Sequence, residues 1–410
     1  MGKFKLTRLE KNWVKYDVGN SAFVLLSSSV IPIYFANLAG NNGQAMIYWG
    51  YGESIASLVV ALLMPHLGSI ADYKGNKIRF FVSFFGLGVL ATLVLGLSVS
   101  WLLFLAVYIL ASIGLNSSMV FYDSMLTDIT DDSRMDQVSS FGYAMGYIGS
   151  CIPFVLCIGL ILFGDKIGLS GYLPTQIAFV VTAVWWLIFT IPLVRDYKQR
   201  YYKEKEPHLF RNTFRRLGNT MKKIFHDKAV FFFILAYFFY IDGVHTIIKM
   251  ATSYGAALGI DSTQLILALL VTQIVAFPSA ILYGRLASKY RTRLMLGISI
   301  AAYFAITVFA AFFLKSALEF WILAVAVGLF QGGIQALSRS YFGRLVPKEN
   351  SNEFFGFFDV FGKYAAVIGT ALVSGITHLT GRSELGVLSI AALFVAGFIL
   401  LRMVPQNAAD

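Results

Sequence analysis

The feature that most constrains the fold is a long apolar segment that recurs along the whole chain. Each occurrence is long enough to cross a bilayer as a helix, and its apolar residues run continuously instead of alternating, which excludes a β-barrel. The predicted spans are 17–39, 45–67, 79–98, 101–125, 139–163, 173–194, 229–250, 263–284, 294–314, 317–338, 354–378 and 384–404. Only 13% of the residues are charged, against about 25% in soluble domains. The sequence therefore predicts an all-α membrane protein with twelve transmembrane helices.

The distribution of basic residues predicts the orientation of these helices. Of the 33 lysine and arginine residues, 28 lie in alternate connections, whereas the opposite connections carry only Lys166, Lys315 and Arg382. Basic residues concentrate on the cytoplasmic side of membrane proteins, so both termini are predicted to be cytoplasmic. The net charge of +11 is thus explained by topology and gives no reason to expect a nucleic-acid partner. Cys151 and Cys157 fall in one span, which indicates neither a disulfide nor a metal site.

The longest polar segment divides the chain into two parts with six spans each. We predict an N-terminal half at 1–194, a cytoplasmic linker at 195–228 and a C-terminal half at 229–410. Basic residues recur between Arg211 and Lys223. They are compatible with an amphipathic helix on the anionic membrane surface or with a solvated linker.

The two halves resemble each other at a nearly constant distance along the chain. The stretch from Gly68 to Lys77 aligns with the stretch from Gly284 to Arg293 at an offset of 216, and Phe141-Gly142 aligns with Phe355-Gly356 at an offset of 214. Two matches at similar offsets indicate a duplication. Two related six-helix halves are typical of transporters whose binding site lies near the membrane midplane.

A short charged loop between the second and third spans is the first candidate site. It contains Gly68, Asp72, Gly75, Lys77 and Arg79. Its glycines allow a sharp turn or a close approach of backbones, and its carboxylate can accept from the N-terminus of a neighbouring helix. This pattern resembles the loop between helices 2 and 3 of the major facilitator superfamily, which implies a cytoplasmic gate. The alternative is a basic cytoplasmic loop with ordinary turn glycines.

Charged side chains inside the spans are the second set of candidates, because burying a charge in a bilayer is costly and often marks function. Asp242, His245 and Lys249 share one face of the seventh span. They could bind a zwitterion or relay a proton; the alternatives are a self-neutralised structural group and a Lys249 that reaches the membrane surface. Glu53, deep in the second span, is a proton-site candidate.

The other polar candidates fall on four further spans. Asn116 and Asp123 share a face of the fourth span, and the tenth span contributes Gln331 and Gln335 and ends at Arg339. Asp17 lies near the cytoplasmic end of the first span, where we expect capping or gating. Asp359 and Lys363 stand four residues apart in the eleventh span, a spacing that suits a structural salt bridge or a switch. In the major facilitator fold, spans 1, 4, 7 and 10 line the central cavity.

Three segments carry a narrower resemblance. They are the stretch from Trp13 to Phe35, the stretch from Asp132 to Gly149, and the stretch from Gln331 to Lys363. Together they resemble the vacuole-effluxer-like family of the major facilitators, which is related to an autophagy-linked permease of fungal vacuoles. The fungal members are linked to amino-acid efflux. The compact length resembles bacterial members, which implies a bacterial inner membrane.

These observations predict a secondary active transporter that moves a small polar solute, with amino acids as one candidate class, by alternating access and with proton coupling. We expect a monomer surrounded by membrane lipids, with no cofactor and no bound metal. A lipid or lysolipid is the alternative substrate class, and a receptor or channel is the alternative function. No Walker loop supports ATP-driven transport. An enzyme such as a polytopic acyltransferase or lipid hydrolase is not expected, because it needs a clustered nucleophile and base, and His66 and His245 lack a convincing arrangement of partners in the sequence.

Overall fold

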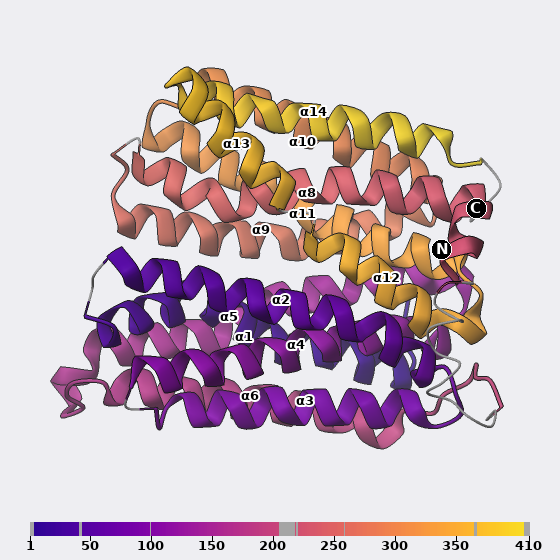
Figure 1. The fold of residues 1–410 in the computed structure, drawn as a ribbon, viewed down its shortest axis with the longest axis horizontal. Helices are drawn as coiled ribbons and strands as arrows, with labels where there is room; N and C mark the ends of the chain where they lie inside the picture. Colours follow the sequence, from indigo (N-terminus) through magenta and orange to yellow (C-terminus); the bar gives the residue numbers. More distant parts are fainter. Residues whose placement is uncertain are drawn as a thin grey trace. The chain divides into compact units, whose positions relative to one another are not determined.

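The computed structural model describes residues 4–40, 43–98, 100–204, 218, 220–257, 259–364 and 367–405, and helices make up nearly all of this part (Figure 1). Within it, the β pairing is one isolated bridge between Tyr73 and Lys203. The α-helices are α1 (Arg8–Leu38), α2 (Gly43–Ala71), α3 (Asn76–Leu95), α4 (Trp101–Ile129), α5 (Met135–Phe163), α6 (Leu173–Asp196), α8 (Lys228–Ala257), α9 (Ser262–Ala287), α10 (Thr292–Phe313), α11 (Ala317–Leu345), α12 (Ser351–Tyr364), α13 (Val367–Thr380) and α14 (Ser383–Met403). Short 3₁₀ helices are η1 (Asp132–Arg134), η2 (Gly164–Ile167) and η3 (Lys348–Asn350).

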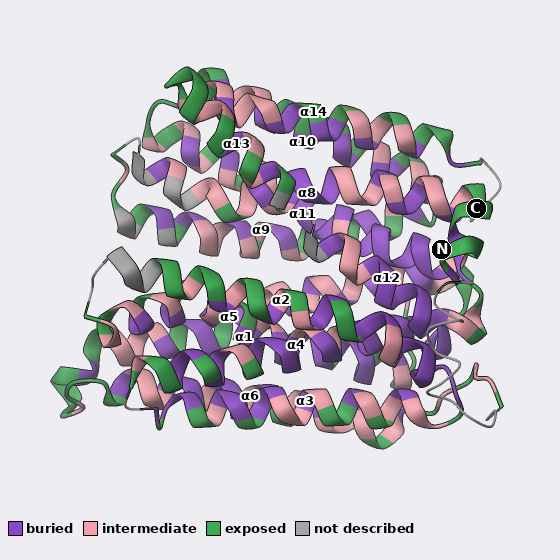
Figure 2. Cartoon of the chain, in the orientation of Figure 1, coloured by how far each residue is buried: buried purple, intermediate pink, exposed green. Residues whose placement is uncertain are grey.

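Eleven helices in the described part are long and apolar enough to span a membrane, and a shorter apolar helix covers Ile368–Thr380. The predicted span at 354–378 corresponds to α12 and α13, which lie on either side of residues 365 and 366. Large apolar side chains such as Leu62, Leu90 and Leu102 are more than 60% exposed, and exposed positions recur along the helices in Figure 2. A bilayer is the environment that suits such surfaces.

Several helix ends are specified by local sequence. Thr7 and Glu10 form a capping box at the start of α1, with the Thr7 amide 2.7 Å from Glu10 Oε2 and the Glu10 amide 3.2 Å from Thr7 Oγ1. These contacts satisfy amide groups that a helix start leaves without partners. Between α2 and α3, Gly75 adopts a φ of 76°, which glycine reaches without steric cost.

The chain divides into two compact units. Unit 1 comprises Met1–Ile129, Met145–Thr213 and Glu349–Gly356; unit 2 comprises Thr130–Ala144, Phe214–Lys348 and Phe357–Asp410. Two of the helices given above are therefore shared: α5 begins in unit 2 and continues in unit 1, whereas α12 begins in unit 1 and continues in unit 2. The boundaries at 1–194, 195–228 and 229–410 stay a prediction.

The helices repeat at the offset that the sequence indicated. α3, α4, η1 and α5 begin 216 residues before α10, α11, η3 and α12, respectively. Equivalent helices also pack in equivalent pairs: α2 and α3 contact α4 in unit 1, and α9 and α10 contact α11 in unit 2. Residues 216 apart can therefore be compared directly between the two units.

Candidate functional site

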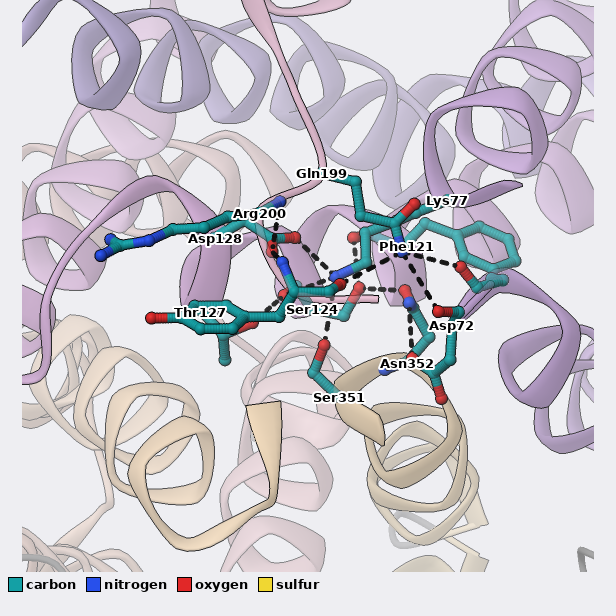
Figure 3. Close-up of polar contacts among 12 residues, drawn as sticks. Asp72, Lys77, Phe121, Ser124, Thr127, Asp128, Gln199, Arg200, Ser351 and Asn352 are labelled. Atoms are coloured by element: carbon teal, nitrogen blue, oxygen red, sulfur yellow. Dashed lines mark hydrogen bonds and ion pairs between the residues drawn. The ribbon is translucent and has the colours of Figure 1, made fainter. Parts of the chain in front are cut away.

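The first candidate site lies in unit 1, around Asp72 in the loop between α2 and α3 (Figure 3). The backbone amide and the side-chain amide of Asn352 donate to Asp72 Oδ1 at 2.9 and 2.8 Å, and the Glu353 amide donates to Oδ2 at 3.2 Å. These amides belong to the first turn of α12, where amide groups have no partner within their own helix. A Cβ atom on Gly68 would stand 2.5 Å from the Asn352 carbonyl oxygen. The absence of a side chain at Gly68 therefore allows α2 to approach α12.

A buried ion pair lies beside Asp72. Lys77 Nζ is 2.7 Å from Asp128 Oδ2, and both side chains are fully buried. Lys77 also donates to Ser351 Oγ at 3.1 Å, and Ser124 Oγ donates to the Asn352 side-chain oxygen. Lys77 thus connects the start of α3, the end of α4 and the start of α12 through one ammonium group.

The segment that follows α6 completes this site. Tyr197 donates its hydroxyl to Asp128 Oδ2, and the backbone amides of Arg200 and Tyr201 donate to Asp128 Oδ1 at 3.1 and 2.9 Å. The Lys203 amide donates to the Asp72 carbonyl oxygen at 2.8 Å. Residues 197–203, which the sequence placed in a linker, are therefore bound to the loop. We call Asp72, Lys77, Ser124, Asp128 and Ser351–Glu353 the first cluster.

The protonation of Asp72 depends on two opposed effects. Burial is the larger effect and raises the pKa of Asp72 from 3.8 to about 7, because a buried carboxylate loses its hydration. The positive charges of Lys77 and Lys203 and the hydrogen bonds from Asn352 act in the opposite direction. The carboxyl group in the cluster therefore binds a proton more tightly than a solvated aspartate does.

A second cluster lies in unit 2, around Asp136 at the start of α5. Asp136 Oδ2 is 2.9 Å from Arg344 Nη1 and accepts from Thr292 Oγ1 at 2.6 Å, while Ser340 Oγ donates to Oδ1. Arg344 also donates to Thr292 Oγ1 at 2.7 Å. The second cluster comprises these four residues and connects the start of α5 with the start of α10 and the end of α11.

Arg339 lies close to this cluster and is only 1% exposed. Its guanidinium group donates to Ser139 Oγ at 2.9 Å and to the Ser139 carbonyl oxygen at 3.0 Å, and it covers the ring of Tyr143 at 4.4 Å. Gln137 donates to Ser288 Oγ at 2.9 Å. Arg339 therefore adds a second connection between α5 and α11.

The two clusters are related by the duplication, with their charges exchanged. Ser340 binds Asp136 as Ser124 binds Asn352, and each residue of one pair lies 216 positions from its equivalent in the other. The acidic residues of α4 and η1 are replaced by basic residues of α11 and η3 at the same offset: Asp123, Asp128 and Asp132 correspond to Arg339, Arg344 and Lys348. Position 136 in α5 is an aspartate, whereas the equivalent position 352 in α12 is an asparagine. A carboxylate is therefore present at this position in the second cluster and absent from it in the first.

Asp242 in α8 forms a separate polar site in unit 2. It is completely buried, and its Oδ1 accepts from the Gly369 amide at 2.9 Å and from Thr246 Oγ1 at 3.2 Å. Oδ2 is also buried and has no hydrogen-bond partner among the described residues. A Cβ atom on Gly369 would lie 2.1 Å from Thr246 Oγ1, so this position needs glycine. The second oxygen is free to take a proton.

Three candidates on α1, α2 and α4 have partners within unit 1. Tyr108 donates its hydroxyl to Glu53 Oε1, and Tyr122 donates to Asp17 Oδ2 at 2.7 Å. Asn116 donates to the Ser112 carbonyl oxygen at 2.8 Å within its own helix. Both carboxylates are therefore held by tyrosine hydroxyls of α4.

The remaining candidates differ in burial. Asp123, His245, Gln335 and Asp359 are partly buried, Gln331 is buried, and Arg79 and Lys249 are exposed. Gln331 lines a cavity in unit 2. The Lys363 side chain lies outside the described residues. The expected ion pair between Asp359 and Lys363 therefore stays a prediction.

The sequence did not identify the partners of Asp72 or the whole second cluster. Asn352, Glu353, Asp128 and Asp136 are polar residues near helix ends, and nothing in their immediate surroundings distinguishes them. The offset of 216 is the signal that could have found them, because it aligns Asp128 with Arg344 and Asp136 with Asn352. Paired changes of charge at equivalent positions mark both clusters.

Sequence comparison identifies relatives over almost the whole chain. A family model described as vacuole effluxer Atg22 like matches residues 47–410. The uncharacterized MFS-type transporter YxiO of Bacillus subtilis (strain 168) is 46% identical over 412 residues, which cover 98% of this chain and 96% of YxiO. Autophagy-related protein 22 of Botryotinia fuckeliana (strain B05.10) is 24% identical over 62% of this chain. That alignment covers 47% of the fungal protein, so the chain spans about half the fungal length.

Structural comparison finds the same fold in distant proteins. The human organic anion transporter MFSD10 superimposes with a TM-score of 0.73 at 13% identity, covering 96% of this chain and 98% of MFSD10. The major facilitator transporter FucP in the outward conformation superimposes with a TM-score of 0.70 at 16% identity, covering 98% of both chains. At these identities the likeness concerns the fold alone.

Proposed function

Because the chain belongs to the vacuole effluxer Atg22-like family of major facilitator transporters, we propose that it moves a small polar solute by alternating access, coupled to protons. Its all-α major facilitator fold agrees with the sequence prediction. The observation that carries the proposal is the attachment of Asp72 to the first turn of α12. That helix begins in unit 1 and continues in unit 2, so a movement of unit 2 would act directly on this contact.

In this proposal the two clusters hold one conformation closed on the predicted cytoplasmic side. The first cluster binds the beginning of α12 to the loop between α2 and α3, and the second binds the beginning of α5 to α10 and α11. The bound start of α12 lies in the C-terminal half of the sequence but belongs to unit 1. The bound start of α5 lies in the N-terminal half of the sequence but belongs to unit 2. Opening would separate each bound segment from its cluster, which is a two-state change of the kind that alternating access requires.

The first cluster is expected to weaken as the pH rises. Since the pKa of Asp72 is about 7 in the cluster and 3.8 as its ordinary value, the contact is strongest below pH 3.8 and loses stability until the pH passes about 7. Lys77, Lys203, Asp128, Glu353 and Tyr197 face the same site. Hydrogen exchange should show that protection factors of the Asn352 and Glu353 amides decrease between about pH 4 and pH 7 and change little above that.

Asp72→Asn is the matched variant for this measurement. The carboxamide keeps the shape of the side chain, but its NH₂ group would face an amide donor of α12, so protection should be lower and independent of pH. Transport should be impaired while membrane insertion stays normal. The same pH profile in the variant as in the wild type would contradict the role of Asp72.

We assign the coupling proton to Asp242, with Glu53 as the second candidate. Asp242 is buried and has one carboxylate oxygen without a partner among the described residues, whereas Glu53 is partly exposed and accepts from Tyr108. A buried carboxylate with an unoccupied oxygen can bind and release a proton when access to water changes.

Asp242→Asn should abolish accumulation driven by a pH gradient in proteoliposomes, by about tenfold or more, and should retain solute counterflow. The reason is that exchange of loaded carriers does not require net proton movement. Glu53→Gln is the matched carboxylate-to-amide variant at the second candidate: loss of gradient-driven uptake in this variant, with uptake retained in Asp242→Asn, would move the assignment to Glu53. Wild-type uptake that does not respond to the pH gradient would exclude proton coupling for both residues.

The substrate class can be tested directly with the purified protein. Thermal stabilisation across a panel of amino acids, peptides, sugars and lysolipids should select ligands, which are then tested for flux in proteoliposomes. We expect amino acids to stabilise the protein and to accumulate. Downhill flux without accumulation would indicate a channel, and stabilisation without flux would indicate a receptor.

A further inference from the structure

Unit 2 contains a cavity of about 520 Å³ that the clusters and Asp242 do not use. It lies among α8, α9, α10, α11, α13 and α14, and its volume is within the range of small-molecule binding sites, about 300–1,000 Å³. Its walls include Ile306, Leu323, Ala324 and Ile390. Several wall residues, such as Ile247, Ile248 and Leu269, are only partly buried.

The inner wall of this cavity is apolar. Thr272 and Thr307 have hydroxyl groups that donate to backbone carbonyl oxygens, at 2.9 Å to Ala268 and at 2.8 Å to Tyr303. Gln273, Gln331 and Ser374 are further polar residues in the lining. Among its described lining residues the cavity has no aspartate, glutamate, lysine or arginine. A charged group of a ligand would lose its hydration here without compensation.

Polar lining residues gather at one end. Tyr254, Thr377, His378 and Ser383 lie near the end of α8, the end of α13 and the start of α14. His378 is exposed there. The cavity therefore combines an apolar interior with a polar entrance, and this combination fits an amphiphile with its chain inside and its head group at the entrance.

The duplication identifies the residues of unit 1 that are equivalent to two residues of the cavity wall. Tyr108 and Glu53 pair there, and Tyr108 also packs against Trp49 with ring centroids 4.3 Å apart. At the offset of 216, Tyr108 corresponds to Ala324 and Glu53 to Leu269, both on the cavity wall. Where unit 1 has a hydrogen-bonded tyrosine and glutamate, unit 2 has an alanine and a leucine.

We propose that this cavity binds the hydrocarbon chain of a single-chain amphiphile. A cavity of this size with apolar walls does not hold ordered water well, and in a bilayer the apolar material available to fill it is an acyl chain. The ammonium, phosphate or carboxylate of the amphiphile would remain at the entrance beside Tyr254, His378 and Ser383. This site is independent of the proton site proposed above.

The test is photolabelling of the full-length protein in phosphatidylcholine nanodiscs. The probe is palmitoyl-lysophosphatidylcholine with a diazirine in its chain, and mass spectrometry locates the labelled peptides. We expect labels on the lining segments of α8, α10, α11 and α14, competition by unlabelled palmitic acid, and no competition by glycerophosphocholine, which lacks the chain.

Ala324→Phe and Ala310→Phe fill the cavity from α11 and from α10, and each should weaken labelling about tenfold, equivalent to ~1.4 kcal/mol. Ala305→Phe is the control, because Ala305 is exposed on α10 and should leave labelling unchanged. Two cavity-filling variants on different helices are used, so that the proposal can still be tested if one of them folds poorly. Equal labelling in all three variants, or labels confined to exposed faces, would overturn the proposal.

A second measurement distinguishes the source of the chain. Flux of the lysolipid across proteoliposomes that Ala324→Phe abolishes would identify the amphiphile as a substrate. Chain binding without lysolipid flux would identify a resident lipid, and both results retain the site. Failure of labelling would leave the transport of polar solutes unaffected, so the two proposals fail separately.

Discussion

Replacing Asp128 with alanine is expected to lower the free energy of unfolding by about 3–5 kcal/mol, because it leaves a buried charge without its partner. Lys77 loses an ion pair at 2.7 Å in a fully buried site. The Tyr197 hydroxyl and the Arg200 and Tyr201 amides lose their acceptor at the same time. The effect should be measured by denaturant unfolding of the purified protein in mixed micelles.

Two further variants define the origin of this loss. Asp131→Ala removes an exposed carboxylate three residues further along and should change stability by at most about 0.5 kcal/mol. The double variant Lys77→Met/Asp128→Ala should recover part of the loss, because it removes the unpaired ammonium group. A double variant that is as unstable as the sum of both singles would show that Lys77 and Asp128 do not depend on each other.

Asp136→Ala should be almost as destabilising, because it leaves Arg344 buried without its carboxylate. The two side chains are only 8% and 10% exposed, and breaking such a pair costs about 3–5 kcal/mol. Arg344→Ala should have a similar effect, and the double variant should be more stable than either single. Thermal unfolding of all three variants measures the coupling between these residues.

Asp132, four residues before Asp136, supplies the control. Asp132 and Lys348 form an ion pair at 3.0 Å whose side chains are 49% and 29% exposed. Exposed pairs contribute about 0–1 kcal/mol, so Asp132→Ala should be nearly neutral. Equal losses for Asp132→Ala and Asp136→Ala would mean that burial does not determine the strength of the second cluster.

The fold could be predicted from the sequence because the length of an apolar run determines whether a helix crosses a bilayer. The ends of the helices were predicted less well: α4 and α11 begin at the predicted residues 101 and 317, but α1 begins nine residues before 17 and α11 ends seven residues after 338. The predicted span at 354–378 is one continuous apolar run in the sequence, and α12 and α13 cover it on either side of residues 365 and 366. Asp72 could also be selected as a candidate from its local sequence, because it is a carboxylate between two glycines.

The partners in both clusters could not be predicted, because a hydrogen bond between distant residues leaves no local pattern. Asn352 is 280 residues from Asp72, and Asp136 is 204 residues from Ser340. Asp242 shows the same limit: it accepts from Thr246 on its own helix and also from Gly369 on another helix, a contact that spacing along one helix does not indicate. The apolar cavity was missed because a cavity is a property of packing.

The division of α12 between the units has a consequence for the synthesis of the chain. The ribosome makes Asp72 early, but the amides that bind its carboxylate belong to Asn352 and Glu353, near the end of the polypeptide. The first six helices can enter the membrane before those residues exist. During most of translation, Asp72 must then be accommodated by water or lipid head groups. A nascent chain that ends before residue 351 therefore lacks part of unit 1. Unit 1 is complete only after most of the second half of the chain has been made.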